Sequence, residues 1–264
     1  MEGFLQRSDN PLSDGLIMVE LHHLLDYCER RLQLAGFSDY CPNGLQVEAG
    51  REVRRLVSGV TASMALIEAA AEAGADALLV HHGYFWKGEA EPLTGMKGRR
   101  IQALFRHGIS LLAYHLPLDA HLELGNNRCL GDRLGMQGAP LSENGLLWVA
   151  ELEEPMAATD LAVRISGGLG REALHVPGGG PIRRVGWCSG GAQGYIEQAA
   201  AAGCDAFISG EISEQTTHQA HELGLHYFAA GHHATERYGV QALGEELATE
   251  FGIGHQFIDI PNPA

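Results

Sequence analysis

The sequence predicts an α/β protein built from two similar lobes. Short apolar runs typical of buried strands alternate with alanine-rich helical segments, and one strand–helix–strand stretch recurs later in the chain. The composition agrees, because 45% hydrophobic residues and 35 glycines fit a folded protein with many tight strand-to-helix turns. A chain of 264 residues is long enough to bury one large core or two modest ones.

The N-terminal stretch differs from the rest of the chain. Residues 1–17 lack the basic and apolar regions of a secretory signal, and amphipathic helix begins only near Val19. We therefore expect a flexible N-terminal extension over residues 1–17, with either Met1 or Met18 as the native start. The first lobe is expected over residues 18–137 and the second over residues 138–264, and the segment from about residue 230 could pack with the first lobe.

Charge, hydropathy and cysteine content exclude several classes of protein. The formal net charge of −15 argues against a protein that binds duplex nucleic acid or anionic membranes, since either needs a basic surface. No apolar run approaches the roughly 18 residues that a membrane span requires. Five cysteines without a CxxC pair suit free thiols in a reducing cytoplasm, which is the expected location.

The first half of the chain reads as alternating strands and helices. A Pro-Asn-Gly turn at residues 42–44 leads into a short strand. Gly74 is placed to cap the C-terminus of the predicted helix that ends at residue 73. A loop is expected over residues 84–98. Further strands are predicted at residues 56–61, 77–80 and 109–114, and helices at residues 63–73, 100–106 and 126–134.

The second half has weaker signals before its own strong repeat. Strands are predicted at residues 146–152 and 173–176, with a helix at residues 158–166 between them. The Pro-Gly-Gly-Gly-Pro run at residues 177–181 could form a phosphate cradle. Prolines at both ends and the lack of a following Lys-Ser/Thr pair favour an ordinary turn between strands.

Two stretches of the chain match each other without a gap. Residues 54–77 align with residues 183–206, and both copies read as strand, helix, glycine, Asp-Ala and a second apolar strand. After a longer loop in the first copy, residues 107–113 align with residues 223–229. A duplicated unit of this length predicts two lobes that face each other, so that strand ends from both lobes converge on one cleft.

Polar side chains stand at the carboxyl ends of the predicted strands, where open α/β sheets place their chemistry. Among them, His232 and Glu236 open a helix, and their i, i+4 spacing puts both on one face. Any one of these side chains has an ordinary explanation, as a surface histidine or as an acid near a helix start. Together, at strand ends of both copies, they favour a metal site in the cleft between the lobes, with the ligands His81, His82, Asp119, His232 and Glu236.

The donor set predicts the kind of metal. Imidazoles with carboxylates suit Zn, Fe, Mn, Co or Ni, whereas Ca and Mg prefer an all-oxygen shell. Five ligands exceed what one catalytic zinc needs and fit two divalent ions roughly 3.5–4 Å apart, with one of the adjacent histidines on each ion and Asp119 as the bridge. His115 and His233 are candidates for acid–base catalysis or for supporting contacts. The remaining histidines, His226 among them, are expected to lie in solvent.

Five separated motifs carry a resemblance to a known family. They are Pro42-Asn43-Gly44-Leu45-Gln46-Val47, Val80-His81-His82-Gly83, His115-Leu116-Pro117-Leu118-Asp119, Gly210-Glu211 and Gly231-His232-x3-Glu236. In this order they resemble the Nif three-like family, whose members are catalogued as GTP cyclohydrolase 1 type 2 homologues. The resemblance runs from Val19 to the C-terminus. It implies two similar α/β lobes, a dinuclear metal centre held by the five ligands above, and a toroidal homohexamer whose centres face an internal cavity.

Two functional hypotheses follow from the motifs and the resemblance. The first is a dinuclear metal-dependent hydrolase, GTP cyclohydrolase 1 type 2-like, that acts on a nucleotide or purine-type substrate. A metal-bridging hydroxide would attack an electrophilic carbon such as C8 of guanine, and His115 or His233 would move the proton. Two-metal phosphoester hydrolysis would use the same parts. The second hypothesis is a non-catalytic, metal-binding, ring-forming scaffold or metal-handling protein.

The two hypotheses differ in what they require beside the metals. A nucleotide substrate needs phosphate contacts, for which the nearby candidates are Lys87, Lys97, Arg99, Arg100 and Arg237. Polar residues 211–216, at the matching strand end of the second copy, could contact the substrate or simply cap the start of a helix.

Overall fold

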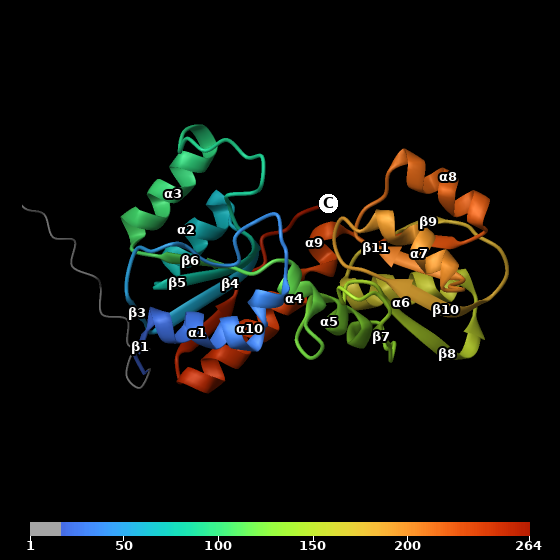
Figure 1. Cartoon of the computed structure of the whole chain (residues 1–264), viewed down its shortest axis with the longest axis horizontal. Coiled ribbons are helices and arrows are strands. Elements are labelled where there is room, and N and C mark those ends of the chain that lie inside the picture. Colours follow the sequence, from blue (N-terminus) through green and yellow to red (C-terminus); the bar gives the residue numbers. More distant parts are fainter. Residues whose placement is uncertain (1–16) are drawn as a thin grey trace, which may run out of the picture.

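The computed structural model describes residues 17–264. The predicted N-terminal extension therefore lies outside the described residues, apart from Ile17, whose backbone N–H donates to the carbonyl of Gly252 at 3.1 Å. The described chain is α/β, with two sheets at opposite ends of an elongated molecule and short helices α4 (Leu116–Ala120) and α9 (His232–Thr235) between them (Figure 1). The α/β class predicted from the sequence is confirmed.

The first sheet has five strands, of which four adjacent ones run parallel to one another. Its order is β13 (Gly254–Phe257), β4 (Arg55–Thr61), β5 (Ala77–His82), β6 (Ser110–Ala113) and β2 (Gly44–Val47), of which β2 runs antiparallel to β6. A small separate ladder joins β1 (Val19–Glu20) to β3 (Glu52–Val53).

Both faces of the first sheet are covered by helices, which explains why its strands are continuous apolar runs. Successive residues point to opposite faces. Leu79 belongs to the core under α1 (Leu21–Arg31) and α10 (Arg237–Phe251). Its neighbour Leu78 belongs to the core under α2 (Met64–Glu72) and α3 (Gly95–His107). The short 3₁₀ helix η1 (Leu34–Gly36) follows α1.

The second sheet is six-stranded and is covered in the same way. Its order is β7 (Ala139–Pro140), β8 (Trp148–Met156), β10 (Ile182–Trp187), β11 (Ala206–Ser209), β12 (His226–Ala229) and β9 (Leu174–Val176), with β10, β11 and β12 parallel. The helices on its two faces are α5 (Asn126–Arg133) and α6 (Ala158–Leu169) on one, and α7 (Ile196–Ala201) and α8 (Glu214–Leu223) on the other, with the 3₁₀ helix η2 (Gln193–Tyr195) before α7.

The two stretches that align in the sequence form units with matching local contacts. In the first, β4 pairs with β5 from Leu56 opposite Ala77, and in the second β10 pairs with β11 from Val185 opposite Ala206. The aspartate before each second strand accepts two backbone N–H groups at the start of the first strand, at 2.9 and 3.0 Å for Asp76 and at 2.8 and 2.9 Å for Asp205. An origin of both units in one duplicated segment remains a prediction.

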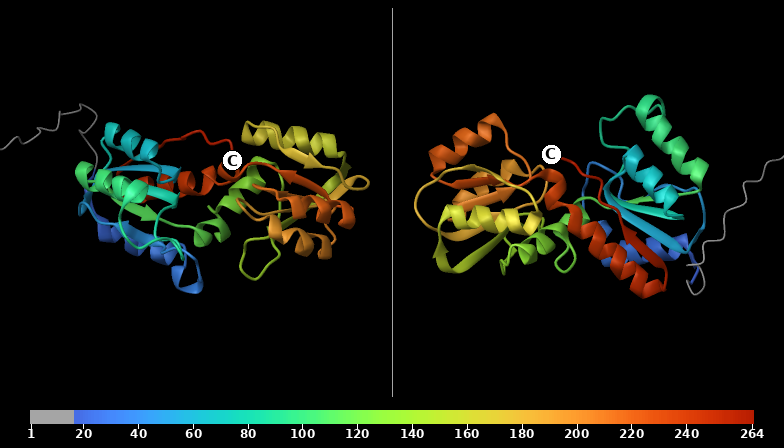
Figure 2. Two further views of the ribbon diagram at one scale, coloured as in Figure 1. Left: turned by 90° about the horizontal axis from the view of Figure 1, so that it is seen from above. Right: turned by 180° about the vertical axis from the view of Figure 1, so that it is seen from behind.

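The chain crosses between the two sheets more than once. Helix α5 lies before residue 138, yet its Leu130 packs in the core of the second sheet. Helix α10 and strand β13 come last in the chain and pack on the first sheet, and Figure 2 shows α10 beneath that sheet from behind. Residues from both halves therefore meet in the middle of the molecule.

Two sequence expectations about local structure were wrong. Helix α3 begins at Gly95 rather than at the predicted residue 100, because the glycines that weaken the helical pattern are needed for close packing. A Cβ on Gly98 would collide with the carbonyl of Leu93. His226 is buried rather than solvated, since the glycine loop closes over it and its Nε2 donates to the carbonyl of Gly180 at 3.0 Å.

Within residues 17–264, none of the helices combines the length and the apolar character needed to cross a bilayer.

Truncation of the buried strand β5 gives a first test of the core. We expect Leu79→Ala to lower the free energy of unfolding by about 2–5 kcal/mol, because the side chain of Leu79 is 0% exposed and its truncation leaves a cavity in the core. Leu93→Ala, in the exposed loop before α3, should change it by less than about 0.5 kcal/mol. Urea denaturation of both variants measures the difference, and equal effects would contradict this description of the core.

Candidate metal centre

The carboxyl ends of the parallel strands in both sheets point at the same place. Strand β5 ends in His81 and His82, and the segment after β6 carries His115 and then α4. From the other sheet, α9 follows β12 and begins at His232. Figure 1 shows α4 and α9 between the two sheets, so the strand ends meet there. The cluster formed in this way, called the histidine–carboxylate cluster below, consists of His81, His82, His115, Asp119, His232 and Glu236.

Glu236 lies at the centre of the cluster. Its Oε1 is 3.5 Å from Nε2 of His81, and its Oε2 is 3.2 Å from Nε2 of His82 and 3.1 Å from Nε2 of His232. On the far side of His81, Nε2 is 3.4 Å from Oδ2 of Asp119. Three imidazole nitrogens and two carboxylates thus point at one another.

The cluster has a buried end and an open end. His81, Asp119 and Glu236 are 0%, 5% and 3% exposed. The side chains of His82 and His232 are 18% and 28% exposed. Within residues 17–264, the side of the cluster at these two histidines is therefore the one that faces solvent.

Contacts behind the three histidines turn their Nε2 atoms toward the centre. Nδ1 of His81 donates to the carbonyl of Tyr114 at 2.8 Å, and Nδ1 of His232 donates to Oε1 of Glu211 at 2.7 Å. Nδ1 of His82 lies 3.2 Å from the hydroxyl of Thr61. An occupied Nδ1 leaves the Nε2 lone pair free to bind a cation, which is how metal-ligating histidines are usually held.

The two acidic groups are held differently. Oδ1 of Asp119 accepts hydrogen bonds from Asn126 at 2.9 Å and from Ser189 at 3.0 Å, so only Oδ2 faces His81. Glu236 keeps both oxygens directed at histidines. Glu236 rather than Asp119 is therefore the carboxylate that faces ligands on both sides, because one oxygen of Asp119 is already engaged.

The environment shifts the pKa values of these groups in opposite directions. Burial acts to raise the pKa of Glu236, but His81 and His82 outweigh it and hold that pKa well below its usual range. Burial acts to lower the pKa of His81, but Asp119 and Glu236 outweigh it and raise that pKa well above normal. For His232 burial is outweighed by Glu236 and Glu211, and the pKa rises to about 9. The two carboxylates thus favour positive charge between them, from protons or from a metal.

The residues present fit a metal. Nε2 of His81 and Oε2 of Glu236 are buried without a hydrogen-bond partner in the described part of the chain, which is costly unless a further group satisfies them. The donor atoms form two sets that share Glu236 and in which all atoms lie within 4.8 Å of one another: His82, His232 and Glu236, and His81, Asp119 and Glu236. Imidazoles with carboxylates are the donors that Zn, Fe, Mn, Co and Ni take.

The two histidines predicted for acid–base chemistry lie in different places. His115 is buried in the cluster, with its ring 5.0 Å from that of His81, and its Nδ1 is 2.9 Å from Oδ1 of Asp39. His233 points away, since its Nε2 lies 2.7 Å from Oδ1 of Asp259 in the C-terminal segment. The structure therefore brings His115 together with the five predicted ligands and does not bring His233.

Asp39 is a residue that the sequence reasoning missed. Its second oxygen accepts from Asn43 and from the backbone N–H of Leu116, both at 3.0 Å, and Asn43 in turn accepts from the backbone of His115 at 2.7 Å. Burial acts to raise the pKa of Asp39, but the hydrogen bonds from His115 and Asn43 prevail and bring it to about 2. The Pro-Asn-Gly turn was a usable signal, since Asn43 stands in it.

Other polar residues of the predicted site have ordinary roles. Ser213 caps α8, because its hydroxyl accepts from the backbone N–H of Thr216 at 3.3 Å. Arg237 donates to Asp259 at 3.1 Å and to the carbonyl of Leu169 at 2.6 Å, and Lys97 lies 3.6 Å from Glu89. Both cations are thus already engaged by oxygen atoms.

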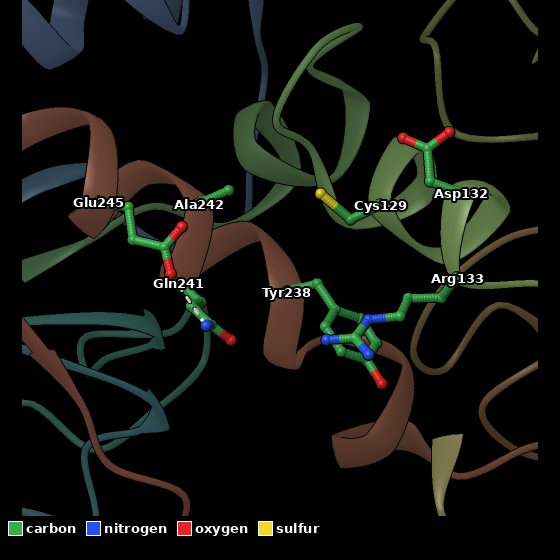
Figure 3. Close-up of a pocket in the computed structure, with 7 residues that line it drawn as sticks. All are labelled: Cys129, Asp132, Arg133, Tyr238, Gln241, Ala242 and Glu245. Atoms are coloured by element: carbon green, nitrogen blue, oxygen red, sulfur yellow. Dashed lines mark hydrogen bonds between the residues drawn. The ribbon is translucent and has the colours of Figure 1, made fainter. Parts of the chain in front are cut away.

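A separate open pocket of about 340 Å³ lies between α5 and α10 (Figure 3). Its lining residues are Cys129, Asp132, Arg133, Tyr238, Gln241, Ala242 and Glu245. In the figure the guanidinium of Arg133 covers the ring of Tyr238, at 4.7 Å from its centroid. The pocket contains no member of the histidine–carboxylate cluster, so it is not part of the candidate metal centre.

Glu211 gives a test of the contacts behind the ligands. We expect Glu211→Gln to lower metal affinity by about tenfold, since an amide can still accept from His232 but no longer offers a negative charge. Glu214→Gln, an exposed residue of α8 with the same charge change, is the control and should bind metal like the wild type. Competition with a coloured chelator measures the affinity, and equal values for both variants would mean that Glu211 has no such role.

The chain is similar to known proteins over nearly its whole length. A protein of Allochromatium vinosum named GTP cyclohydrolase 1 type 2 homolog is 60% identical over 252 residues, which cover 94% of this chain and 99% of the relative. A solved structure described as protein ybgI, of unknown function, is 48% identical and has a TM-score of 0.90. The match covers 93% of this chain and 100% of that one. A structure from Thermus thermophilus is 34% identical with a TM-score of 0.82, and the match covers 93% of this chain and 100% of that one.

The match extends to a whole-family description. A family model described as Duf34/NIF3 (NGG1p interacting factor 3) matches residues 19–263. This range includes both sheets and every residue of the histidine–carboxylate cluster. The chain therefore belongs to the Duf34/NIF3 family.

Proposed function

We propose that this protein is a metal-dependent hydrolase that acts on a nucleotide or a related purine compound. The observation that carries the proposal is the convergence of three Nε2 atoms and two carboxylates on a centre that is open on one side. The substrate class is supported by the relatives, which are named GTP cyclohydrolase 1 type 2 homolog.

Two divalent ions, of Zn, Fe, Mn, Co or Ni, would be held by His81, His82, Asp119, His232 and Glu236. His81 and Asp119 would serve one ion, His82 and His232 the other, and Glu236 would face both. When bound, the ions would supply Lewis-acid activation of water and of an electrophilic carbon or phosphorus atom.

The chain's own groups would handle the proton. Nδ1 of His115 is fixed by Asp39, and one nitrogen of its ring lies within 4.8 Å of the donor atoms of His81 and His82. An imidazole held in this way can take a proton from the attacking water and deliver it to the leaving atom. His233 was the alternative candidate, and its contact with Asp259 makes it the weaker one.

The cellular setting is part of the proposal. We infer a cytoplasmic protein, because the five cysteines are free within the described chain and four of them are buried. We also infer a toroidal homohexamer, on the basis of the family resemblance. Size-exclusion chromatography with light scattering measures the assembly directly, and a monomer would contradict this inference.

The function is tested by hydrolysis of a nucleotide panel with metal-loaded protein. The expected result is turnover of GTP or another purine nucleotide that requires the metal and disappears in Asp119→Ala. Ring opening and phosphate release are followed separately, because cyclohydrolase and phosphoester chemistry give different products. Bound metal with no turnover of any nucleotide would reject the hydrolase.

A second candidate function is a non-catalytic metal-binding scaffold or metal-handling protein. It is favoured by one specific observation: Arg237 and Lys97, two of the cations expected to hold a phosphate, are engaged by Asp259 and Glu89. Reversible metal uptake and release without turnover of any member of the panel is the result that this candidate predicts.

Asp39 provides a test of proton transfer that does not disturb the ligands. We expect Asp39→Asn to reduce kcat by about 100-fold, because the amide oxygen can still accept from His115 but no longer carries the negative charge that stabilises a protonated His115. Metal content and KM should stay unchanged, and the pH profile of kcat should change shape. Asp26→Asn, on the exposed face of α1, is the control. A loss of bound metal in Asp39→Asn would assign this residue a structural role instead.

A further inference from the structure

Two aromatic side chains stand beside the open end of the histidine–carboxylate cluster. The ring of Trp86 lies 5.0 Å from that of His115 and 6.0 Å from that of His82. The ring of Tyr40 lies 5.3 Å from His115 and 6.3 Å from Trp86, with 34° between the planes of the two aromatic rings. Tyr40 is 54% exposed. Two partly exposed aromatic side chains therefore lie next to the cluster, with Trp86 beside His82.

The loop that carries Trp86 is held in an unusual backbone conformation. Phe85 has a φ of 65°, which non-glycine residues rarely adopt and which persists only where the surroundings impose it. Here Oε2 of Glu89 accepts the backbone N–H groups of Phe85 and Trp86 at 2.7 and 3.2 Å. The indole N–H of Trp86 donates to the carbonyl of Gly83 at 3.2 Å. These contacts fix the direction of the indole.

The loop of Trp86 is also tied to the loop of Tyr40. The backbone N–H of Lys87 donates to the carbonyl of Tyr40 at 2.7 Å. Gln46 accepts from the backbone of Tyr84 at 2.7 Å and donates to the carbonyl of Pro42 at 2.9 Å. Both loops are therefore fixed to each other through their backbones, which keeps the two residues side by side.

Core packing does not account for this pair. The other two tryptophans, Trp148 and Trp187, are 2% and 0% exposed and lie in the core of the second sheet. Trp86 is only partly buried, and neither it nor Tyr40 belongs to any of the four core clusters of the described chain. The strained backbone at Phe85 instead accompanies an aromatic side chain that lies beside the histidine–carboxylate cluster.

We propose that Tyr40 and Trp86 form a stacking subsite that receives the planar heteroaromatic ring of the substrate and selects nucleobase-type compounds over non-aromatic phosphoesters. This inference rests on the proposed function, since it names the part of the substrate that the same site recognises. Stacking on an aromatic side chain accepts any flat ring, so the pair selects for aromaticity rather than for one base. A ring stacked here lies next to His82 and His115, where the chemistry would take place.

Calorimetry on metal-loaded protein tests the subsite, with guanosine, adenosine and ribose 5-phosphate as probes. The expected result is saturable binding of both nucleosides and no comparable binding of ribose 5-phosphate. Trp86→Leu and Tyr40→Leu should each weaken guanosine binding by about tenfold or more, and Trp86→Phe should restore most of it. Phe105→Leu, an exposed aromatic of α3 that is 57% exposed, is the control and should bind like the wild type.

Intrinsic fluorescence gives an independent measurement in the wild type. Because Trp148 and Trp187 are buried, quenching by a stacked nucleoside reports on Trp86. Elemental analysis of every variant verifies that the metal centre is retained. The inference is overturned if wild-type protein binds no nucleoside, if ribose 5-phosphate binds as tightly as guanosine, or if both leucine variants bind guanosine within about twofold of wild type.

The outcomes also separate this inference from the proposed function. Nucleosides that bind through Tyr40 and Trp86, without turnover of any nucleotide, would reject the hydrolase and keep the subsite. Metal-dependent turnover that is unchanged in both leucine variants would keep the hydrolase and reject the subsite.

Discussion

Asp119→Ala is expected to reduce bound metal from about two ions per chain to about one or fewer. The change removes a buried ligand oxygen and leaves the side chains of Ser189 and Asn126 without their acceptor. Because His81 faces Asp119 on one side and Glu236 on the other, the ion served by His81 should be lost first. Plasma mass spectrometry on purified, metal-reconstituted protein gives the number of ions and their identity.

The control for this experiment is Asp132→Ala in α5. This change also removes one negative charge, but from a side chain that is 46% exposed and pairs with Arg128. It should keep the wild-type metal content. Full metal content in Asp119→Ala would show that this residue is not a ligand, and absence of metal from reconstituted wild type would reject the metal centre altogether.

Removal of the metals is expected to lower the melting temperature by at least about 10 °C. One ion present at 1,000 times its Kd stabilises the native state by about 4 kcal/mol, and a protein of this size shifts by about 2–4 °C per kcal/mol. The physical reason is local: Nε2 of His81 and Oε2 of Glu236 are buried without hydrogen-bond partners in the described chain. Differential scanning calorimetry before and after dialysis against a chelator measures the shift.

The size of this shift should increase with pH. In the metal-free protein His232 has a pKa of about 9 against an ordinary 6.5. A raised folded-state pKa contributes stability that is complete below about pH 6.5 and disappears as the pH rises through about 9. Metal binding strengthens over the same range, because protons compete less for the histidines. Asp119→Ala should show a smaller shift on chelation than the wild type, because it binds less metal. A wild-type shift that is independent of pH would contradict the assignment of His232.

Much of the candidate site could be predicted from the order of residues alone. In a parallel sheet all carboxyl ends lie at one edge, so His81 and His82 at the end of β5 and Asp119 after β6 had to be neighbours. The i, i+4 spacing placed His232 and Glu236 together for an equally local reason. Strand identity was readable as well, because strands buried on both faces are continuous apolar runs.

Supporting residues were harder to foresee, although one signal went unused. Ser189 also follows a strand, β10, and the rule that identified the ligands would have identified it. Asp39 lies in a loop and contacts His115, and Asn126 lies in a helix and donates to Asp119. No periodicity in the sequence indicates either contact. Their partners are 76 and 7 residues away in the chain, respectively.

The sequence by itself determined the α/β class, the five candidate ligands and the kind of metal they suit, because these depend on local pattern and on the donor chemistry of single residues. Only the tertiary structure decided that Glu236 faces ligands on both sides, that His115 joins the cluster while His233 turns to Asp259, and that His226 is buried under a glycine loop. These features depend on how α4, α9 and the loops between the two sheets pack against one another. That packing is settled by contacts between residues far apart in the chain, which no local pattern records.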